Sequence, residues 1–225
     1  MCSSKEEGVF MTISNKDLVN GILESLSRIE HINLEDIPDI DLYMDQVTTL
    51  MDSKLKATTR YPGEDKILTK TMINNYAKND LLPPPVKKKY SKEHVLLLIF
   101  IYYYKGFLSI NDIQTLLQPI TDKYFQGKNN LKLEDIYEEV FRMEDAEIVS
   151  LKEDVRKKFE MAEETFAGVE GEDAEFLRQF SFICMLSYDV YVKKLLIEKM
   201  IDDMRKSQQP AEKSDKKEKQ EKKEK

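Results

Sequence analysis

Lysine is concentrated in one stretch of an otherwise acidic chain. Residues 54–92, here called the basic island, hold ten Lys and Arg against three Asp and Glu. The whole chain of 225 residues carries a formal charge of −7, so the residues outside the basic island sum to −14. A local excess of +7 indicates a surface that meets an anion, and a polyanion such as DNA is the leading candidate.

A short helix is expected inside the basic island, from Thr69 to Asn79, with Thr69 as its N-cap. Met72, Ile73 and Tyr76 recur at helical spacing and are expected to face inward. Asparagine can bind adenine through two hydrogen bonds, lysine can bind guanine or phosphate, and threonine can reach either. The side chains left for such contacts are Thr69, Lys70, Thr71, Asn74, Asn75 and Lys78.

A projecting loop is expected next, because the run 83–85 consists of three prolines, which cannot continue a helix or pair within a central strand. This extended loop or small wing would carry Lys87, Lys88 and Lys89 to the phosphates of a duplex. Tyr76 and Tyr90 leave two alternatives open. Each donates its hydroxyl to a phosphate, or each packs between the helix and the wing.

Read together, residues 69–117 resemble the DNA-binding core of the MerR family of bacterial transcription regulators. The resemblance rests on Asn75-Tyr76-Ala77-Lys78-Asn79-Asp80-Leu81-Leu82-Pro83, on Lys89-Tyr90-Ser91-Lys92-Glu93, and on Gly106-Phe107-Leu108-Ser109-Ile110-Asn111-Asp112-Ile113. These stretches are similar to that family's recognition helix with its "GLL-P" entry to a wing, to the wing exit with a capped helix, and to its "GFSL-x-EI" turn. Residues 37–117 look closer still to an uncharacterised bacterial domain family of MerR-like kind.

The resemblance implies a winged helix-turn-helix core that binds duplex DNA as a homodimer. The recognition helix, about residues 69–78, would enter the major groove, and the basic wing, residues 83–90, would lie on the backbone. Two departures stand out. About a dozen residues separate Leu55 from Ile67, where that family has a short turn, and Asn74 or Asn75 replaces the usual arginine of the recognition helix.

The remaining chain is expected to be mainly α, since apolar residues recur every three to four positions and Gly and Pro are few. Ser91 is expected to cap a buried helix, and Pro119 to mark the end of the helix that follows Ser109. The apolar positions of the last helix wrap too far round for a simple coiled coil, which indicates central packing or a dimer interface. The helices are expected at about 16–29, 42–54, 69–79, 92–104, 109–119, 133–141, 148–166 and 173–206.

Four regions follow from these patterns. An N-terminal helix occupies residues 1–36, and the MerR-like domain occupies residues 37–120. An acidic helical region for dimerisation or sensing occupies residues 121–206; within it, residues 134–175 carry −11. The Lys- and Glu-rich residues 207–225 lack apolar side chains and are expected to form a disordered tail.

Catalytic and metal chemistry find little support in the sequence. The two cysteines and the two histidines, Cys2, Cys184, His31 and His94, are not spaced as metal ligands or as a nucleophile with its base. Each histidine is expected at the surface or at a helix end. Neither an enzyme activity nor a cofactor is expected. The longest apolar run, residues 95–104, is about half of what a membrane span needs, so a soluble, cytoplasmic protein is expected.

Two functions remain in competition. The first is a MerR-like transcription regulator that binds duplex DNA as a homodimer, with or without a small effector. The alternative is a non-catalytic protein-interaction module that keeps the helix-turn-helix scaffold and uses its acidic helices to dock a basic partner. The sequence favours the first, because helix, proline entry, basic wing and capped helix occur in one order.

Overall fold

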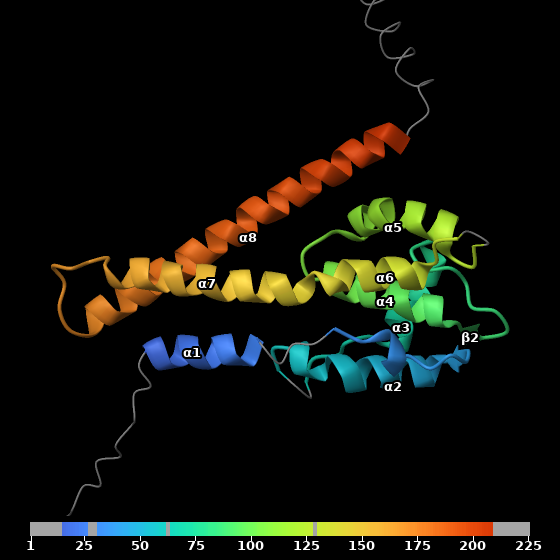
Figure 1. The fold of residues 1–225 in the computed structure, drawn as a ribbon, viewed down its shortest axis with the longest axis horizontal. Coiled ribbons are helices and arrows are strands. Elements are labelled where there is room, and N and C mark those ends of the chain that lie inside the picture. Colours follow the sequence, from blue (N-terminus) through green and yellow to red (C-terminus); the bar gives the residue numbers. More distant parts are fainter. Residues whose placement is uncertain (1–14, 27–30, 62–63, 128–129, 209–225) are drawn as a thin grey trace, which may run out of the picture. The chain divides into compact units, whose positions relative to one another are not determined.

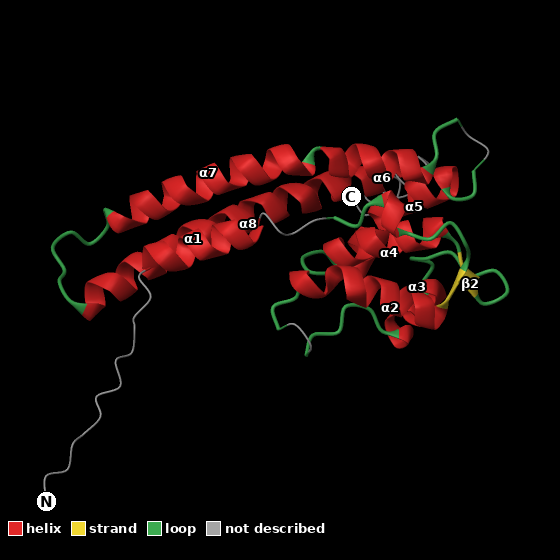
Figure 2. Cartoon of the chain, turned by 60° about the horizontal axis from the view of Figure 1, so that its bottom comes forward, coloured by secondary structure: helices red, strands yellow, loops and turns green. Residues whose placement is uncertain are grey.

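The computed structural model describes residues 15–26, 31–61, 64–127 and 130–208, and this part of the chain is mainly helical (Figures 1 and 2). Two compact units are present. The larger unit combines residues 31–144 with residues from 187 onward, and the smaller unit combines α1 with residues 145–186. The N-terminal residues 1–14 and the tail from 209 lie outside the described residues. The helices are α1 (Asn15–Leu26), α2 (Met44–Leu55), α3 (Lys70–Lys78), α4 (Lys92–Tyr104), α5 (Ile110–Tyr124), α6 (Leu133–Arg142), α7 (Glu144–Glu163) and α8 (Glu172–Gln208).

Helix α4 forms the centre of the larger unit. Its residues from 94 to 101 are all buried, and Leu96, Leu97 and Leu98 have no exposed surface. A helix that is apolar on every side has to be enclosed by other elements. The predicted bounds, 92–104, and the predicted buried character are both confirmed. Ser91 is the N-cap residue, as expected.

Two short strands join the start of this unit to the wing. Strand β1 (Leu42–Tyr43) pairs antiparallel with β2 (Lys89–Tyr90), so that Leu42 lies opposite Tyr90 and Tyr43 opposite Lys89. The predicted helix start at residue 42 is wrong, because α2 starts only at Met44. A two-residue strand leaves no periodic signal, and its partner is distant in the chain.

Pro119 does not end helix α5. The helix continues through it to Tyr124, which corrects the predicted limit. A proline inside a helix removes one hydrogen bond and its ring crowds the carbonyl four residues earlier, and apolar packing on both sides of the proline can compensate this cost. Leu117 before it is buried, and Ile120 and Tyr124 after it pack against the main core.

Helix α6 closes the core on another side. Its Leu133 and Tyr137 are buried. The Tyr137 hydroxyl donates a hydrogen bond of 2.6 Å to the carbonyl of Ile32, which lies near the start of the larger unit. Residues 31–36, which include the short 3-10 turn η1 (Leu34–Asp36), are thereby tied to α6. The predicted acidic region, residues 121–206, includes α6, whereas the buried side chains of α6 belong to the core around α4.

The smaller unit has its own apolar cluster. Val19 and Leu23 of α1 pack with Ala162 of α7 and Phe182 of α8. The rings of Phe159 and Phe182 meet edge to face, with centroids 5.4 Å apart. Helix α8 contributes residues up to 186 to this unit and its later residues to the larger unit. No described helix combines the length and the apolar character that a membrane span requires.

Candidate nucleic-acid interface

Helix α3 separates its apolar side chains from its polar ones. Its N-cap is Thr69, whose hydroxyl accepts a hydrogen bond of 3.2 Å from the backbone N–H of Met72, as predicted. Ile73 and Tyr76 are buried. The candidate contact residues on the other face are exposed, and they are Lys70, Thr71, Asn74, Asn75 and Lys78.

The end of α3 turns sharply back into the core. Asp80 has a φ of 54°, in the left-handed region, and the N–H groups of Leu81 and Leu82 both donate to the Tyr76 carbonyl, at 2.9 and 3.2 Å. Leu81 and Leu82 are buried. This left-handed residue and the two bonds fix the direction in which the chain leaves the helix toward the prolines.

The wing is a tight β-hairpin. Val86 and Lys89 exchange both of their backbone hydrogen bonds, at 3.0 and 3.1 Å, around a two-residue turn formed by Lys87 and Lys88. Both turn residues have positive φ, 51° and 65°, as a type I′ turn requires. Asn-Gly is the usual sequence of such a turn, and lysine has a side chain that penalises this backbone. The hairpin therefore holds two lysines at its tip at a cost in backbone energy.

The two tyrosines of the site are buried. Tyr76 is 7% exposed and Tyr90 is 2% exposed, and burial raises the pKa of both hydroxyls. Of the two alternatives left open by the sequence, packing between the helix and the wing is the one that this burial favours. One exposed aromatic side chain beside the wing is Tyr43 of β1, which was not among the predicted contact residues; the Lys89 ammonium lies 5.2 Å from its ring centroid.

The long connection between α2 and α3 is anchored on α4. The hydroxyls of Thr58 and Tyr102 are 2.7 Å apart, and the Lys105 ammonium donates to the Ile67 carbonyl at 2.5 Å. Burial lowers the pKa of Lys105. These two contacts attach both ends of the connection to the region of α4. The connection is longer than a short turn, but it does not leave α3 loosely held.

Acidic side chains neutralise part of the basic island. Three of its lysines form ion pairs with carboxylates that precede them in the chain, on or before α2. The Lys70 pair joins α3 to the first turn of α2, and both side chains remain more than half exposed. Such pairs contribute little to stability and exchange readily for another anion. The pairs are Lys54 with Asp36, Lys70 with Asp45, and Lys92 with Asp39.

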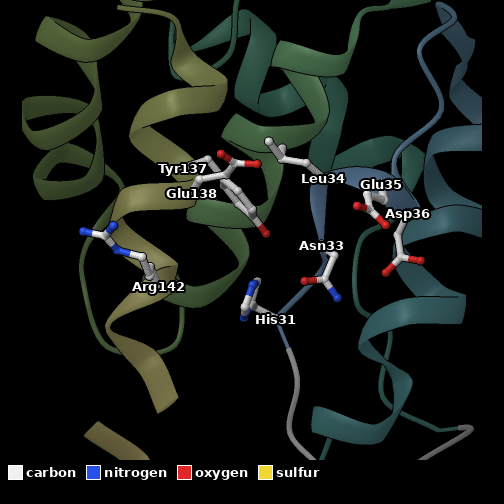
Figure 3. Close-up of a pocket in the computed structure, with 8 residues that line it drawn as sticks. All are labelled: His31, Asn33, Leu34, Glu35, Asp36, Tyr137, Glu138 and Arg142. Atoms are coloured by element: carbon white, nitrogen blue, oxygen red, sulfur yellow. The ribbon is translucent and has the colours of Figure 1, made fainter. Parts of the chain in front are cut away.

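A hollow of about 590 Å³ lies between α6 and residues 31–36 (Figure 3). His31 stacks on Phe141, with ring centroids 5.2 Å apart. A hydrogen bond from Lys54 lowers the pKa of Asp36. The described residues contain no group of three or more His, Cys, Asp or Glu side chains placed to hold a metal ion.

The candidate interface lies within a segment that matches a known family model. Residues 32–140 match a family model described as a domain of unknown function. This segment is a DUF1836 domain. The DUF1836 domain contains α2 to α6 with both strands, and so includes the helix, the wing and the central helix α4. Neither the curated proteins nor the solved structures yielded a match.

Within the DUF1836 domain, His94 is the residue whose placement departs most from expectation. It stands at the start of α4, as expected of a helix-end residue, yet it is 1% exposed and not at the surface. Its Nδ1 accepts the Ser91 backbone N–H at 3.0 Å. The carbonyl groups of Pro84 and Pro83 lie toward the ring, but no described residue makes a hydrogen bond of ordinary geometry with the buried Nε2.

Folding stability is expected to depend on the protonation of His94. Burial lowers its pKa, against the opposing effect of the Pro84 carbonyl, the Asp41 charge and the Pro83 carbonyl. The unfolded chain, with an ordinary histidine pKa of about 6.5, therefore takes up the proton first. The contribution of neutral His94 to stability is complete above about pH 6.5 and is lost as the pH falls below that value.

The check is urea denaturation of the protein between pH 5 and 8. The midpoint should fall on acidification, and His94→Gln should flatten that part of the profile. His31→Gln serves as the control and should keep the same decline. A flat profile in the unsubstituted protein would contradict the role given to His94.

Proposed function

We propose that this protein is a DNA-binding transcriptional regulator of MerR-like winged helix-turn-helix type. The observation that supports it best is the combination of an exposed polar face on α3 with a strained hairpin that keeps two lysines at its tip. The order β1, α2, α3, hairpin, α4 is the order in which a winged helix-turn-helix domain of this type is built. Asp80 has a left-handed backbone at the glycine position of the "GLL-P" pattern.

The proposed roles follow from exposure. Lys70, Thr71, Asn74, Asn75 and Lys78 contact base edges and phosphates in the major groove, while Lys87, Lys88 and Lys89 contact the backbone. Tyr76 and Tyr90 position the helix and the wing. Lys70 exchanges its pairing with Asp45 for a phosphate. The protein is non-catalytic and acts in the cytoplasm.

A homodimer through α8 is part of the same proposal. This helix displays large apolar side chains that no other described segment covers: Tyr188, Val190, Tyr191 and Leu196 are each at least 59% exposed. Several large apolar side chains exposed along one helix favour a partner that covers them. A second copy of the chain is the partner that a two-fold symmetric operator requires.

The test is selection from random duplex DNA at two salt concentrations, followed by binding measurements with variants. Asn74→Ala should lose discrimination at one base position, by about 1–3 kcal/mol. Lys78→Ala should weaken all duplexes alike and lower the salt dependence. Asn20→Ala and Lys157→Ala change exposed residues of the same types on α1 and α7 and should leave binding unchanged.

An interaction module that keeps this scaffold is the second candidate. The ion pairs of Lys54, Lys70 and Lys92 favour it, because they reduce the charge available to DNA. In that case no duplex is enriched at either salt concentration from a folded protein. A basic protein partner would then respond to charge reversal at Glu153 and Glu160 of α7, and not to substitutions on α3.

A further inference from the structure

An apolar cavity of about 210 Å³, partly open to solvent, lies in the larger unit between α4, α5, α6 and the end of α8. Phe100 and Tyr104 of α4, Leu116 of α5 and Ile136 of α6 form its walls, and Met204 of α8 borders it. All of these residues belong to the same compact unit. No charged side chain lines the cavity.

The lining determines which molecules can enter. An ionised group against this apolar lining would lose part of its hydration and gain no partner, so the lining disfavours a charged molecule. The Tyr104 hydroxyl stays neutral, because burial raises its pKa. Apolar cavities of about 150 Å³ in proteins stay dry and hold benzene. A cavity of about 210 Å³ therefore has room for one aromatic ring or a short branched hydrocarbon.

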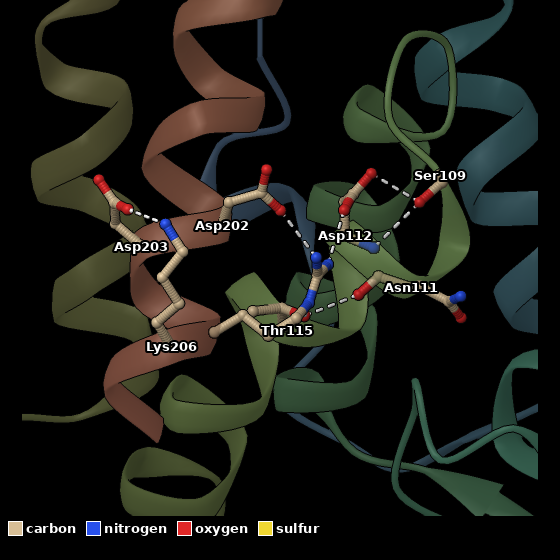
Figure 4. A network of polar contacts seen from close by, with 8 residues as sticks. Ser109, Asn111, Asp112, Thr115, Asp202, Asp203 and Lys206 are labelled. Atoms are coloured by element: carbon tan, nitrogen blue, oxygen red, sulfur yellow. Dashed lines mark hydrogen bonds and ion pairs between the residues drawn. The ribbon is translucent and has the colours of Figure 1, made fainter. Parts of the chain in front are cut away.

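A polar network joins the end of α8 to α5, one residue beyond Met204 (Figure 4). Arg205, adjacent to Met204, donates to Asp112 at 2.8 Å and to Thr115 at 3.3 Å, both on α5, and also pairs with Asp202 at 2.8 Å. Hydrogen bonds from Ser109 and then from Arg205 hold the pKa of Asp112 below its usual range. The ion pair of Asp112 and Arg205 is therefore charged at neutral pH.

Methionine suits the position that faces the cavity. Its unbranched side chain fills irregular space and rearranges at little cost. Met204 can thus follow the shape of whatever occupies the cavity, while Arg205 keeps the helix on α5. A molecule in the cavity would touch Met204 next to this anchor and so bridge the end of α8 to α4, α5 and α6.

We propose that this cavity is a binding site for one small, uncharged apolar molecule, and that the end of α8 is the element that its binding stabilises. Met204, which borders the site, belongs to α8, the helix whose exposed apolar side chains form the proposed dimer interface. Occupancy therefore strengthens the hold of α8 on the rest of the unit. The inference does not depend on DNA binding.

The test uses the full chain and three probes: benzene, n-butylbenzene and benzoate. Benzene or n-butylbenzene is expected to raise the Tm by a few degrees at saturation, and benzoate to leave it unchanged. Ile136→Phe fills the cavity and should abolish the shift. Leu116→Phe fills it from α5 and takes the place of the first variant if that one does not fold. The proposal is wrong if neither hydrocarbon raises the Tm, or if the filled variants show the same rise in Tm as the unsubstituted protein.

The role of α8 has its own measurement. Arg205→Gln should weaken benzene binding, measured by calorimetry, by about fivefold or more. Lys206→Gln is the matched control: Lys206 pairs with Asp203, is 77% exposed, and does not line the cavity, so its substitution should leave the affinity unchanged. Equal affinities of the Arg205→Gln and Lys206→Gln proteins would disprove the coupling to α8.

Discussion

Replacing Lys87 by Asn and Lys88 by Gly together is expected to stabilise the folded protein and to weaken DNA binding at the same time. Both positions have positive φ, so Asn-Gly relieves a penalty that lysine incurs in the left-handed region. The expected gain is about 1 kcal/mol in the free energy of unfolding, after allowing for the added freedom of glycine in the unfolded chain. Urea denaturation measures it.

The same substitution removes two phosphate contacts from the proposed interface. The slope of log affinity against log salt should fall by about 2, and affinity at low salt by about tenfold or more. The charge-preserving variant with Arg at both positions keeps the backbone penalty and should show neither effect. If Asn-Gly stabilised the protein and left duplex affinity unchanged, the hairpin would be a structural turn and the proposed wing contact would be wrong.

Truncation of Leu97 to Ala in α4 is expected to be severely destabilising. Leu97 has no exposed surface and lies in a helix that is enclosed on every side. Loss of its buried methyl groups and the resulting cavity should cost about 2–5 kcal/mol. Calorimetry or urea denaturation at low protein concentration provides the measurement.

Leu196→Ala is the matched control for Leu97→Ala. Leu196 is 59% exposed on α8, so the same chemical change should alter the stability of the isolated chain by less than about 0.5 kcal/mol. At high protein concentration it should instead shift the monomer–dimer equilibrium toward monomer. A loss as large as that of Leu97→Ala at low concentration would mean that α8 is covered within one chain.

The sequence predicted those elements whose signals are local. The α4 bounds follow from an uninterrupted apolar run after Ser91, and the start of α3 follows from a threonine whose hydroxyl can reach the backbone three residues on. Capping and helical periodicity act within a few residues, so they can be read from the chain. The exposed polar face of α3 follows from the same periodicity.

The remaining features depend on partners that are distant in the sequence. The first strand exists because Leu42 meets Tyr90, and helix α5 passes through Pro119 because apolar neighbours support it on both sides. His94 is buried because the wing and Phe125 cover its ring, which no pattern around it indicates. The left-handed lysines contradict turn preferences, and the apolar cavity is assembled from four helices. No local signal carries this information.

The anchoring of the connection before α3 has a consequence for the order of folding. Thr58 and Ile67 are held by Tyr102 and Lys105 of α4, more than 35 residues further along the chain. Helix α3 spans only residues 70–78, and isolated helices of that length are marginal in water. The candidate recognition helix thus acquires its stability only after α4 is in place. Amide exchange in α3 should therefore be faster than in α4, and the surface proposed to read DNA should form after α4 and open before it.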